Sequence, residues 1–122
     1  MARPVIGISG NAYLINDEFP AHAAGRMNTV AVAEVAGGMP MIIPSDPEMV
    51  SVQELMALCD GCVFTGGRPN VHPEEYGYEV SEAYGTFDRA RDGIALPLIQ
   101  ECVKVGQPIL GICRGFQEVN VA

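Results

Sequence analysis

One cysteine near the end of the chain offers the clearest chemistry in this sequence. Cys113 is the central residue of the pentapeptide Gly-Ile-Cys-Arg-Gly, residues 111–115, which separates an apolar run from a stretch with helical character. A Gly-x-Ser-x-Gly pattern at such a junction forms a nucleophile elbow, and here a thiol replaces the hydroxyl group. The sharp turn strains its central residue, and the flanking glycines remove clashes. The pattern therefore predicts that Cys113 projects from the end of a strand as a nucleophile.

The helix predicted to follow the cysteine explains how the thiol would work. The N-terminus of that helix directs its dipole and free N–H groups at the sulfur, which favours the thiolate. The backbone N–H of Arg114 is then placed to stabilise an oxyanion. The alternative is an ordinary cysteine at a strand-to-helix junction. Ser9 also ends a predicted strand, but Asn11 stands where an elbow has its second glycine, so we do not expect Ser9 to be a nucleophile.

The other three cysteines are predicted to be free and structural. Cys59 and Cys62 have the Cys-x-x-Cys spacing of redox and zinc sites. A redox pair needs the start of a helix, whereas this pair leads into an apparent strand. A zinc site needs further ligands, and no second pair is present. We therefore expect Cys59 and Cys62 to be small buried residues beside an Asp-Gly turn, with Cys102 on a core face and no metal or cofactor.

The elements that position Cys113 alternate between strand and helix. Apolar runs predict strands within residues 4–9, 39–45, 61–67 and 107–113, and helical patterns cover residues 26–38, 51–58, 86–106 and 114–122. Such alternation indicates a parallel sheet covered by helices on both faces. Ligands bind at the carboxyl ends of strands in these folds, where Gly10–Asn11, Gly66–Gly67 and Cys113 are expected to lie. Residues 11–25 and 68–85 are predicted to be loops, the second long enough to be functional.

For two of the predicted helices the sequence also predicts the capping residues, and for one of them the apolar face. Ser51 and Glu54 have the spacing of a capping box. Thr86 or Asp88 is expected to cap the long helix, in which Pro97 suggests a kink. The predicted apolar stripe of this helix consists of Ile94, Leu98, Ile99, Cys102 and Val103.

Length and charge limit the classes of protein to be considered. The chain has 122 residues, of which 48% are hydrophobic, and this suits one globular domain. Its net charge of −8 argues against a nucleic acid or an anionic membrane surface as the main partner. The sequence has no apolar run of membrane-spanning length and no signal-peptide pattern, so a cytoplasmic protein is expected. A homo-oligomer is compatible with these properties.

Several segments together resemble the class I glutamine amidotransferase-like proteins, and most closely their γ-glutamyl-γ-aminobutyrate hydrolase branch, the peptidase C26 family. The segments that carry the resemblance are PVIGIS, VAEVAGGMPMIIP, CDGCVFTGG, NVHPEEYG, DRARD and QPILGICRGFQEVNVA. The elbow with Gln117 is typical of the superfamily, and the NVHPEEYG loop is similar to that of the branch. The resemblance implies a flavodoxin-like α/β fold.

The same resemblance implies a hydrolase of γ-glutamyl amides. Cys113 would attack the amide carbonyl and form a thioester that water hydrolyses, with the oxyanion held by the N–H groups of Arg114 and Gly67. Residues expected to contact the small-molecule γ-glutamyl substrate are Gly66, Asn70 and Gln117. The alternative for Gln117 is a solvated helix position.

Four further residues are weighed against the family pattern. Arg91 and Asp92 match the family's Arg-Asp pair, and the alternative is an exposed helical face. The histidines His22 and His72 are predicted to be solvated, because the family places its catalytic base elsewhere.

In the family, the catalytic histidine and its carboxylate lie in a later segment. We therefore expect residues 1–122 to be the N-terminal portion of a single domain, truncated after the elbow and inactive by itself. The leaving amine is not identified by the sequence. Two other functions are considered: a glutaminase unit that delivers ammonia to a synthase partner, and a non-catalytic flavodoxin-like module.

Overall fold

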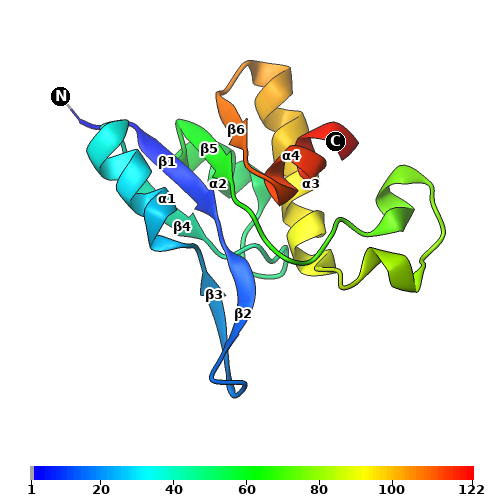
Figure 1. Cartoon of the computed structure of the whole chain (residues 1–122). Coiled ribbons are helices and arrows are strands. Elements are labelled where there is room, and N and C mark those ends of the chain that lie inside the picture. The colour runs from blue at the N-terminus through cyan, green and yellow to red at the C-terminus, as the bar shows by residue number, and fades with distance from the viewer. Residues whose placement is uncertain (1) are drawn as a thin grey trace.

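A parallel sheet forms the centre of the molecule (Figure 1). The computed structural model describes residues 2–122. Four strands pair in the order β4-β1-β5-β6, and every pairing is parallel. Their bounds are β1 (Val5–Ser9), β4 (Met39–Ile43), β5 (Gly61–Phe64) and β6 (Ile109–Gly111). The α/β class and the parallel sheet expected from the alternating pattern are confirmed.

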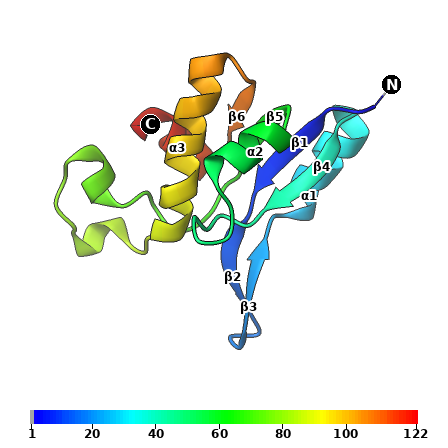
Figure 2. The ribbon, with the colours of Figure 1, turned by 180° about the vertical axis from the view of Figure 1, so that it is seen from behind.

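Helices lie on both faces of this sheet. One face carries α1 (Arg26–Val30), which continues as a π-helical turn, η1 (Ala31–Val35). The opposite face carries α2 (Val52–Leu58) and α3 (Arg89–Val105), as the rear view shows (Figure 2). The last helix, α4 (Arg114–Val121), packs beside β6 and α3. Among residues 2–122, no helix is both long enough and apolar enough to cross a membrane.

The hydrophobic core lies mainly between the sheet and the pair α2 and α3. Both helices turn apolar side chains toward the strands, and these side chains exclude water from the centre of the molecule. The buried residues of this core are Ile43, Leu55, Cys59, Cys62, Phe64, Ile94, Ala95, Leu98, Ile99 and Cys102.

The predicted ends of the helices agree with the structure in most details. Ser51 caps α2, because its hydroxyl accepts a hydrogen bond from the Glu54 N–H at 3.1 Å while the Glu54 carboxylate accepts one from the Ser51 N–H at 3.0 Å. The cap of α3 is Asp88, whose carboxylate accepts from the Arg91 N–H at 3.0 Å. Val103 is 65% exposed, so its place in the apolar stripe was wrong. It lies at the edge of the buried arc in the last turn of α3.

The loop predicted for residues 11–25 is instead mostly a β-hairpin. Strands β2 (Asn11–Ile15) and β3 (Phe19–Ala23) pair antiparallel and project from the sheet. The turn residues Asn16 and Asp17 have φ of 53° and 56°, and positive φ at both central positions is the geometry that favours hairpins. Pro20 suggested a loop, but a two-stranded ribbon consists only of edge strands, where proline is tolerated.

The segments that follow β1, β5 and β6 all start at the end of the sheet where the strands have their carboxyl ends (Figure 1). These three strands are neighbours in the sheet, so their carboxyl ends are adjacent. The hairpin, the loop of residues 65–88 and α4 therefore begin side by side. Within the loop lie two 3₁₀ turns, η2 (Pro73–Tyr76) and η3 (Glu82–Tyr84). The expected convergence of the three strand ends is confirmed.

The close packing of α4 on β5 leads to a first prediction. A Cβ built on Gly115 would lie 1.9 Å from the carbonyl oxygen of Phe64, a backbone atom of a central strand that cannot move aside. Gly115→Ala should therefore lower the free energy of unfolding by about 3 kcal/mol, and Gly115→Val by more. Urea denaturation measures both. Gly25→Ala is the matched control, because its added methyl meets only ordinary contacts. An unchanged stability of Gly115→Ala would contradict this packing.

Candidate active site

Cys113 occupies a strained turn between β6 and α4. Its backbone has φ of 52° and ψ of −104°, a conformation that costs a residue other than glycine about 1–3 kcal/mol. The turn is closed by a hydrogen bond from the Gly115 N–H to the Ile112 carbonyl at 2.9 Å. Cys113 itself is exposed. The strand, sharp turn and helix predicted from the pentapeptide are therefore all present.

Both glycines of the pentapeptide are required by close backbone contacts. A Cβ on Gly111 would lie 2.6 Å from the carbonyl oxygen of Gly115, and one on Gly115 would overlap the carbonyl of Phe64. Real Cβ atoms essentially never approach other heavy atoms so closely. The first turn of α4 is thus packed directly onto β5 and β6, and this explains why the pattern needs glycine on either side of Cys113.

The residues after β5 lie directly beside this turn. A Cβ at Gly66 would be 3.6 Å from the Cβ of Cys113, and the Gly66 carbonyl accepts a hydrogen bond from the Asn11 side chain at 2.9 Å. A Cβ at Gly67 would meet the Asn11 oxygen at 2.6 Å. Arg114 is the first residue of α4, where an N–H has no acceptor within the helix. Arg114 and Gly67 stay the predicted oxyanion donors.

Ser9 serves a different purpose at the end of β1. Its hydroxyl accepts a hydrogen bond from the Thr65 N–H at 2.9 Å, and the Thr65 hydroxyl donates to the Ser9 carbonyl at 2.7 Å. Both residues are buried. This pair ties the ends of β1 and β5 together, which fits the expectation that Ser9 is not a nucleophile.

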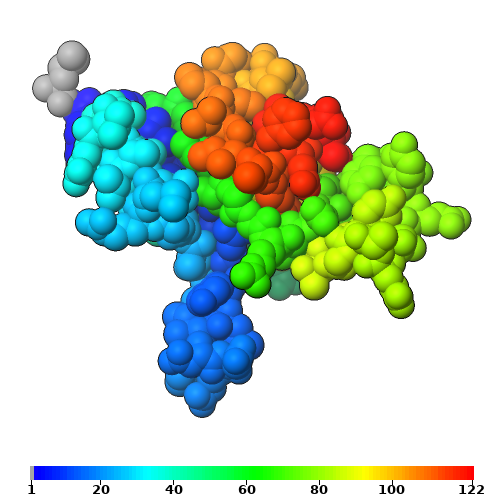
Figure 3. Space-filling view, viewed as in Figure 1, coloured from blue at the N-terminus to red at the C-terminus, as the bar shows by residue number. Residues whose placement is uncertain are grey.

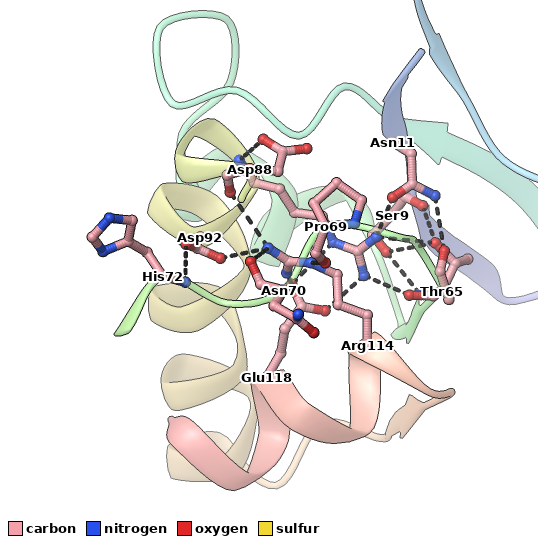
Figure 4. Close-up of polar contacts among 12 residues, drawn as sticks. Ser9, Asn11, Thr65, Pro69, Asn70, His72, Asp88, Asp92, Arg114 and Glu118 are labelled. Carbon is pink, nitrogen blue, oxygen red and sulfur yellow. Dashed lines mark hydrogen bonds and ion pairs between the residues drawn. The ribbon is translucent and has the colours of Figure 1, made fainter. Parts of the chain in front are cut away.

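A buried network of ion pairs lies beneath the site (Figure 4). Arg91 donates to both carboxylate oxygens of Glu118, at 2.7 and 3.0 Å. Arg114 donates to Glu118 and to Asp92, each at 2.7 Å. All four residues are at most 1% exposed. Two guanidinium groups and two carboxylates thus balance in charge, and their hydrogen bonds offset the cost of removing them from water.

The same two arginines also hold the backbone around the site. Arg91 donates to the Asn11 side chain and to the Thr65 carbonyl, each at 2.6 Å. Arg114 donates to the carbonyl of Pro69 at 2.7 Å. The network therefore joins α3 and α4 to the start of the hairpin, the end of β5 and the loop that follows it.

The structure decides between the two readings of the Arg-Asp pair and corrects one reading of a histidine. Arg91 and Asp92 do not form an exposed helical face, because both are buried in the network. His72 is not solvated: it is 8% exposed, its Nδ1 accepts from the Glu74 N–H at 3.2 Å, and its ring packs on Phe87. Tertiary contacts that are distant in sequence bury these polar residues.

Glu118 is the residue of the site that sequence reasoning missed. It lies one helical turn after Arg114, and this i,i+4 spacing of opposite charges was the available signal. Such pairs are usually exposed, so the spacing alone does not indicate burial. His22 is exposed on β3, as expected.

Gln117 and Asn70 line a common pocket of about 480 Å³ between α4 and the loop. Gln117 lies one turn into α4, where its N–H donates to the Cys113 carbonyl at 3.1 Å. Asn70 donates from its side chain to the Tyr84 carbonyl at 2.5 Å. Gly66 lies instead beside Cys113. The structure thus brings two of the three predicted substrate contacts together in one pocket.

The remaining cysteines are free and buried, as predicted. The pKa of Cys59 is lowered by the hydrogen bond from the Cys62 thiol. The pKa of Cys62 is raised because this hydrogen bond holds its proton and because burial disfavours the thiolate. Burial also raises the pKa of Cys102. No group of three histidine, cysteine, aspartate or glutamate side chains within residues 2–122 is arranged to hold a metal ion.

Comparisons with known proteins all point to the same family. A model of the Peptidase C26 family matches residues 4–122. A glutamine amidotransferase-like protein of Rickettsia prowazekii is 33% identical over 98% of this chain and 43% of its own length. A Mycobacterium tuberculosis protein that carries glutamine amidotransferase in its name is 35% identical, over 99% of this chain and 40% of its own length. The γ-glutamyl-γ-aminobutyrate hydrolase of Escherichia coli K12 is 29% identical, over 100% of this chain and 47% of its own length. The chain spans about half the length of these relatives.

Thiol accessibility leads to a second prediction. Under limiting iodoacetamide, Cys113 should be alkylated at least about a hundredfold faster than the other cysteines, because it is exposed while they react only after local opening. Peptide mass mapping after brief labelling measures the order, and labelling in concentrated urea is the control that should equalise the rates. Cys59 is the informative competitor, since its pKa is lowered although it is buried. Faster labelling of Cys59 or Cys62 would refute the prediction.

The ion network leads to a third prediction. Glu118→Gln leaves two buried guanidinium groups with one carboxylate, so the free energy of unfolding should fall by about 3–5 kcal/mol. Urea denaturation measures the loss. Glu34→Gln, the same change at an exposed position, should stay within about 0.5 kcal/mol of the parent chain. A loss for Glu118→Gln no larger than that of Glu34→Gln would show that the network does not stabilise the fold.

Proposed function

This chain belongs to the peptidase C26 family, and from that premise we propose that Cys113 is the nucleophile of a hydrolase acting on γ-glutamyl amides. The observation that carries the proposal is the exposed thiol of Cys113 on a strained turn, beside Gly66 and at the N-terminus of α4. Strain of this kind persists only where the surrounding structure enforces it, and it is concentrated at functional sites.

The proposed reaction proceeds in two halves. The Cys113 sulfur attacks the side-chain carbonyl carbon of the γ-glutamyl group while its proton passes to a general base. The N–H groups of Arg114 and Gly67 stabilise the tetrahedral oxyanion. Collapse breaks the C–N bond, and the base returns the proton to the departing amine. Water then hydrolyses the thioester, which releases glutamate and restores the thiol.

The general base is proposed to come from outside the described residues. The Nδ1 of His72 already accepts a hydrogen bond from the Glu74 N–H, and its ring packs on Phe87. Within residues 2–122, neither His72 nor His22 forms a hydrogen bond with Cys113. A cysteine nucleophile on a difficult amide needs such a base, so the proposal requires a histidine and a carboxylate from another part of the protein.

A glutaminase unit is the second candidate. Two of the relatives described above carry glutamine amidotransferase in their names, and glutamine is itself a γ-glutamyl amide whose leaving group is ammonia. The two functions share the acyl-transfer step at Cys113 and differ in the fate of the amine. Ammonia release from glutamine that increases when a synthase partner is added would favour the second candidate.

The fourth prediction tests the Cys113 nucleophile independently of the general base. It uses an acylation that needs no proton transfer to the leaving group. The 122-residue chain should form a thioester with an activated γ-glutamyl aryl ester, since that leaving group needs no proton. It should not turn over the γ-glutamyl amide of γ-aminobutyrate, because loss of triad members costs roughly 10⁴-fold or more in rate. Intact-protein mass spectrometry detects the acyl group, and free γ-aminobutyrate reports turnover.

Cys113→Ala is the control, and it should show no acyl group removable by hydroxylamine. Acylation that persists in Cys113→Ala would refute the assignment of the nucleophile. Amide turnover by the chain alone would place the base within these residues and make His72 the candidate.

A further inference from the structure

Asn11 joins the start of the hairpin to the backbone that follows β5. The hairpin extends away from the rest of the molecule (Figure 3), and Asn11 is its first residue, two positions after the end of β1. The side-chain nitrogen of Asn11 donates to the Gly66 carbonyl at 2.9 Å, and its side-chain oxygen accepts from the Arg91 guanidinium at 2.6 Å. Each half of the amide group therefore has a partner.

The chemistry of these two partners requires an amide between them. A guanidinium only donates hydrogen bonds, so the atom that faces Arg91 must be an acceptor. A carbonyl only accepts, so the atom that faces Gly66 must be a donor. Aspartate would satisfy Arg91 but place a second oxygen against the Gly66 carbonyl, and alanine would satisfy neither. The two contacts together fix the direction in which the Asn11 amide is turned.

The absence of a side chain at Gly67 leaves room for Asn11. A Cβ at Gly67 would lie 2.6 Å from the Asn11 side-chain oxygen and 3.5 Å from a guanidinium nitrogen of Arg91. The first distance is shorter than real Cβ contacts, so a larger residue would displace the Asn11 amide. Gly67 has no left-handed φ, so its backbone conformation does not by itself demand glycine. The close approach of Asn11 explains why glycine is needed at this position.

The hydrogen bond from Asn11 sets the orientation of the peptide plane between Gly66 and Gly67. This peptide bond is trans, and in a trans peptide the carbonyl and the following N–H point in opposite directions. The Gly67 N–H is therefore turned away from the Asn11 nitrogen that holds the carbonyl. Within residues 2–122, neither the Gly67 N–H nor the Arg114 N–H donates a hydrogen bond. Both predicted oxyanion donors are thus available to a ligand.

A peptide between two glycines needs such an anchor. Glycine limits the rotation of neighbouring peptide planes less than other residues do, and a rotation of about 180° would exchange the N–H for a carbonyl oxygen. A carbonyl oxygen would repel a developing oxyanion, whereas an N–H stabilises it. The preceding carbonyl, that of Thr65, is held by Arg91 at 2.6 Å. Side chains therefore fix two consecutive carbonyls directly before Gly67.

We propose that Asn11 is a positioning residue of the Cys113 site, which holds the Gly66–Gly67 peptide so that the Gly67 N–H faces the oxyanion. The proposal rests on the proposed function, because the oxyanion forms only when Cys113 is acylated. A Cβ on Gly66 would be 3.6 Å from the Cβ of Cys113, so the anchored peptide lies directly beside the nucleophile. Asn11 acts through this peptide and not on the reacting atoms.

The fifth prediction compares two reactions of the Cys113 thiol. Acylation by the γ-glutamyl aryl ester builds an oxyanion, whereas alkylation by iodoacetamide displaces iodide and builds none. Asn11→Asp keeps the acceptor for Arg91 and removes the donor for Gly66. It should slow acylation by about ten- to a hundredfold and leave alkylation within about twofold of the parent chain. The loss should appear in the rate constant at saturating ester, which the absorbance of the released aryl alcohol measures.

Two further variants serve as controls. Asn16→Asp is the same change at the exposed turn of the same hairpin, and it should alter neither reaction. Asn11→Ala removes the donor without adding a charge, and it should again slow acylation more than alkylation. Urea denaturation verifies that each variant folds.

Relaxation of the Gly67 amide tests the anchoring without any reaction. In a chain labelled with ¹⁵N-glycine, the Gly67 N–H should have the order parameter of rigid backbone, about 0.85, and Asn11→Asp should lower it below about 0.6. The amide of Gly106, at the far end of α3, is the control and should not change. An unchanged order parameter of Gly67 in Asn11→Asp would overturn the proposal.

The kinetic outcomes separate this proposal from the proposed function. Normal acylation of Asn11→Asp would refute the role of Asn11 alone. An equal slowing of acylation and alkylation would do the same, since it would indicate a general disturbance of Cys113. A change confined to the ester concentration at half-saturation would also refute it, because it would indicate a contact with the substrate. Absence of acylation in the parent chain would refute the proposed function, and the role of Asn11 with it.

Discussion

The buried pairing of Arg91 and Arg114 with Asp92 and Glu118 is the constraint on which the rest of this structure depends. A guanidinium or carboxylate without a partner in the interior costs several kcal/mol, so none of the four groups can leave without loss of stability. Their partners lie on α3 and α4, on the Asn11 side chain at the start of β2, and on the Thr65 carbonyl just after β5. The relative placement of these elements is therefore decided by charge satisfaction as well as by apolar packing.

The strained turn at Cys113 follows from the same arrangement. A positive φ at a cysteine is unfavourable by itself, and it persists because α4 is held from two sides. Gly115 packs against the carbonyl of Phe64 at the start of the helix, and Glu118 anchors its second turn to α3. With both positions fixed, the chain between β6 and α4 has only a sharp turn available. The proposed nucleophile thus derives its exposed position from contacts made by residues that never touch it.

Residues on different sides of α4 lie in different surroundings. Its N-terminus directly follows Cys113, Glu118 lies in the buried network, and Phe116 and Gln117 line the pocket beside the loop. Since successive helical residues are rotated by about 100°, neighbours in sequence serve separate surroundings. Arg114 combines two of these tasks, because its side chain holds the loop while its backbone N–H is a proposed oxyanion donor. The Cys113 thiol and the pocket beside the loop are consequently positioned by a single helix.

The sequence by itself determined the α/β class, the strand, turn and helix around Cys113, the capping box of α2 and the burial of Cys59, Cys62 and Cys102. These features depend on local spacing or on apolar periodicity, which a single sequence displays. Only the tertiary structure decided that residues 11–23 form a hairpin, that His72 is buried, and that Arg91 and Glu118 form a buried pair. Charged side chains usually remain in water, and their burial requires a partner that the fold supplies from 27 residues away. A contact of that kind has no local signature, because its energy arises only when α3 and α4 meet.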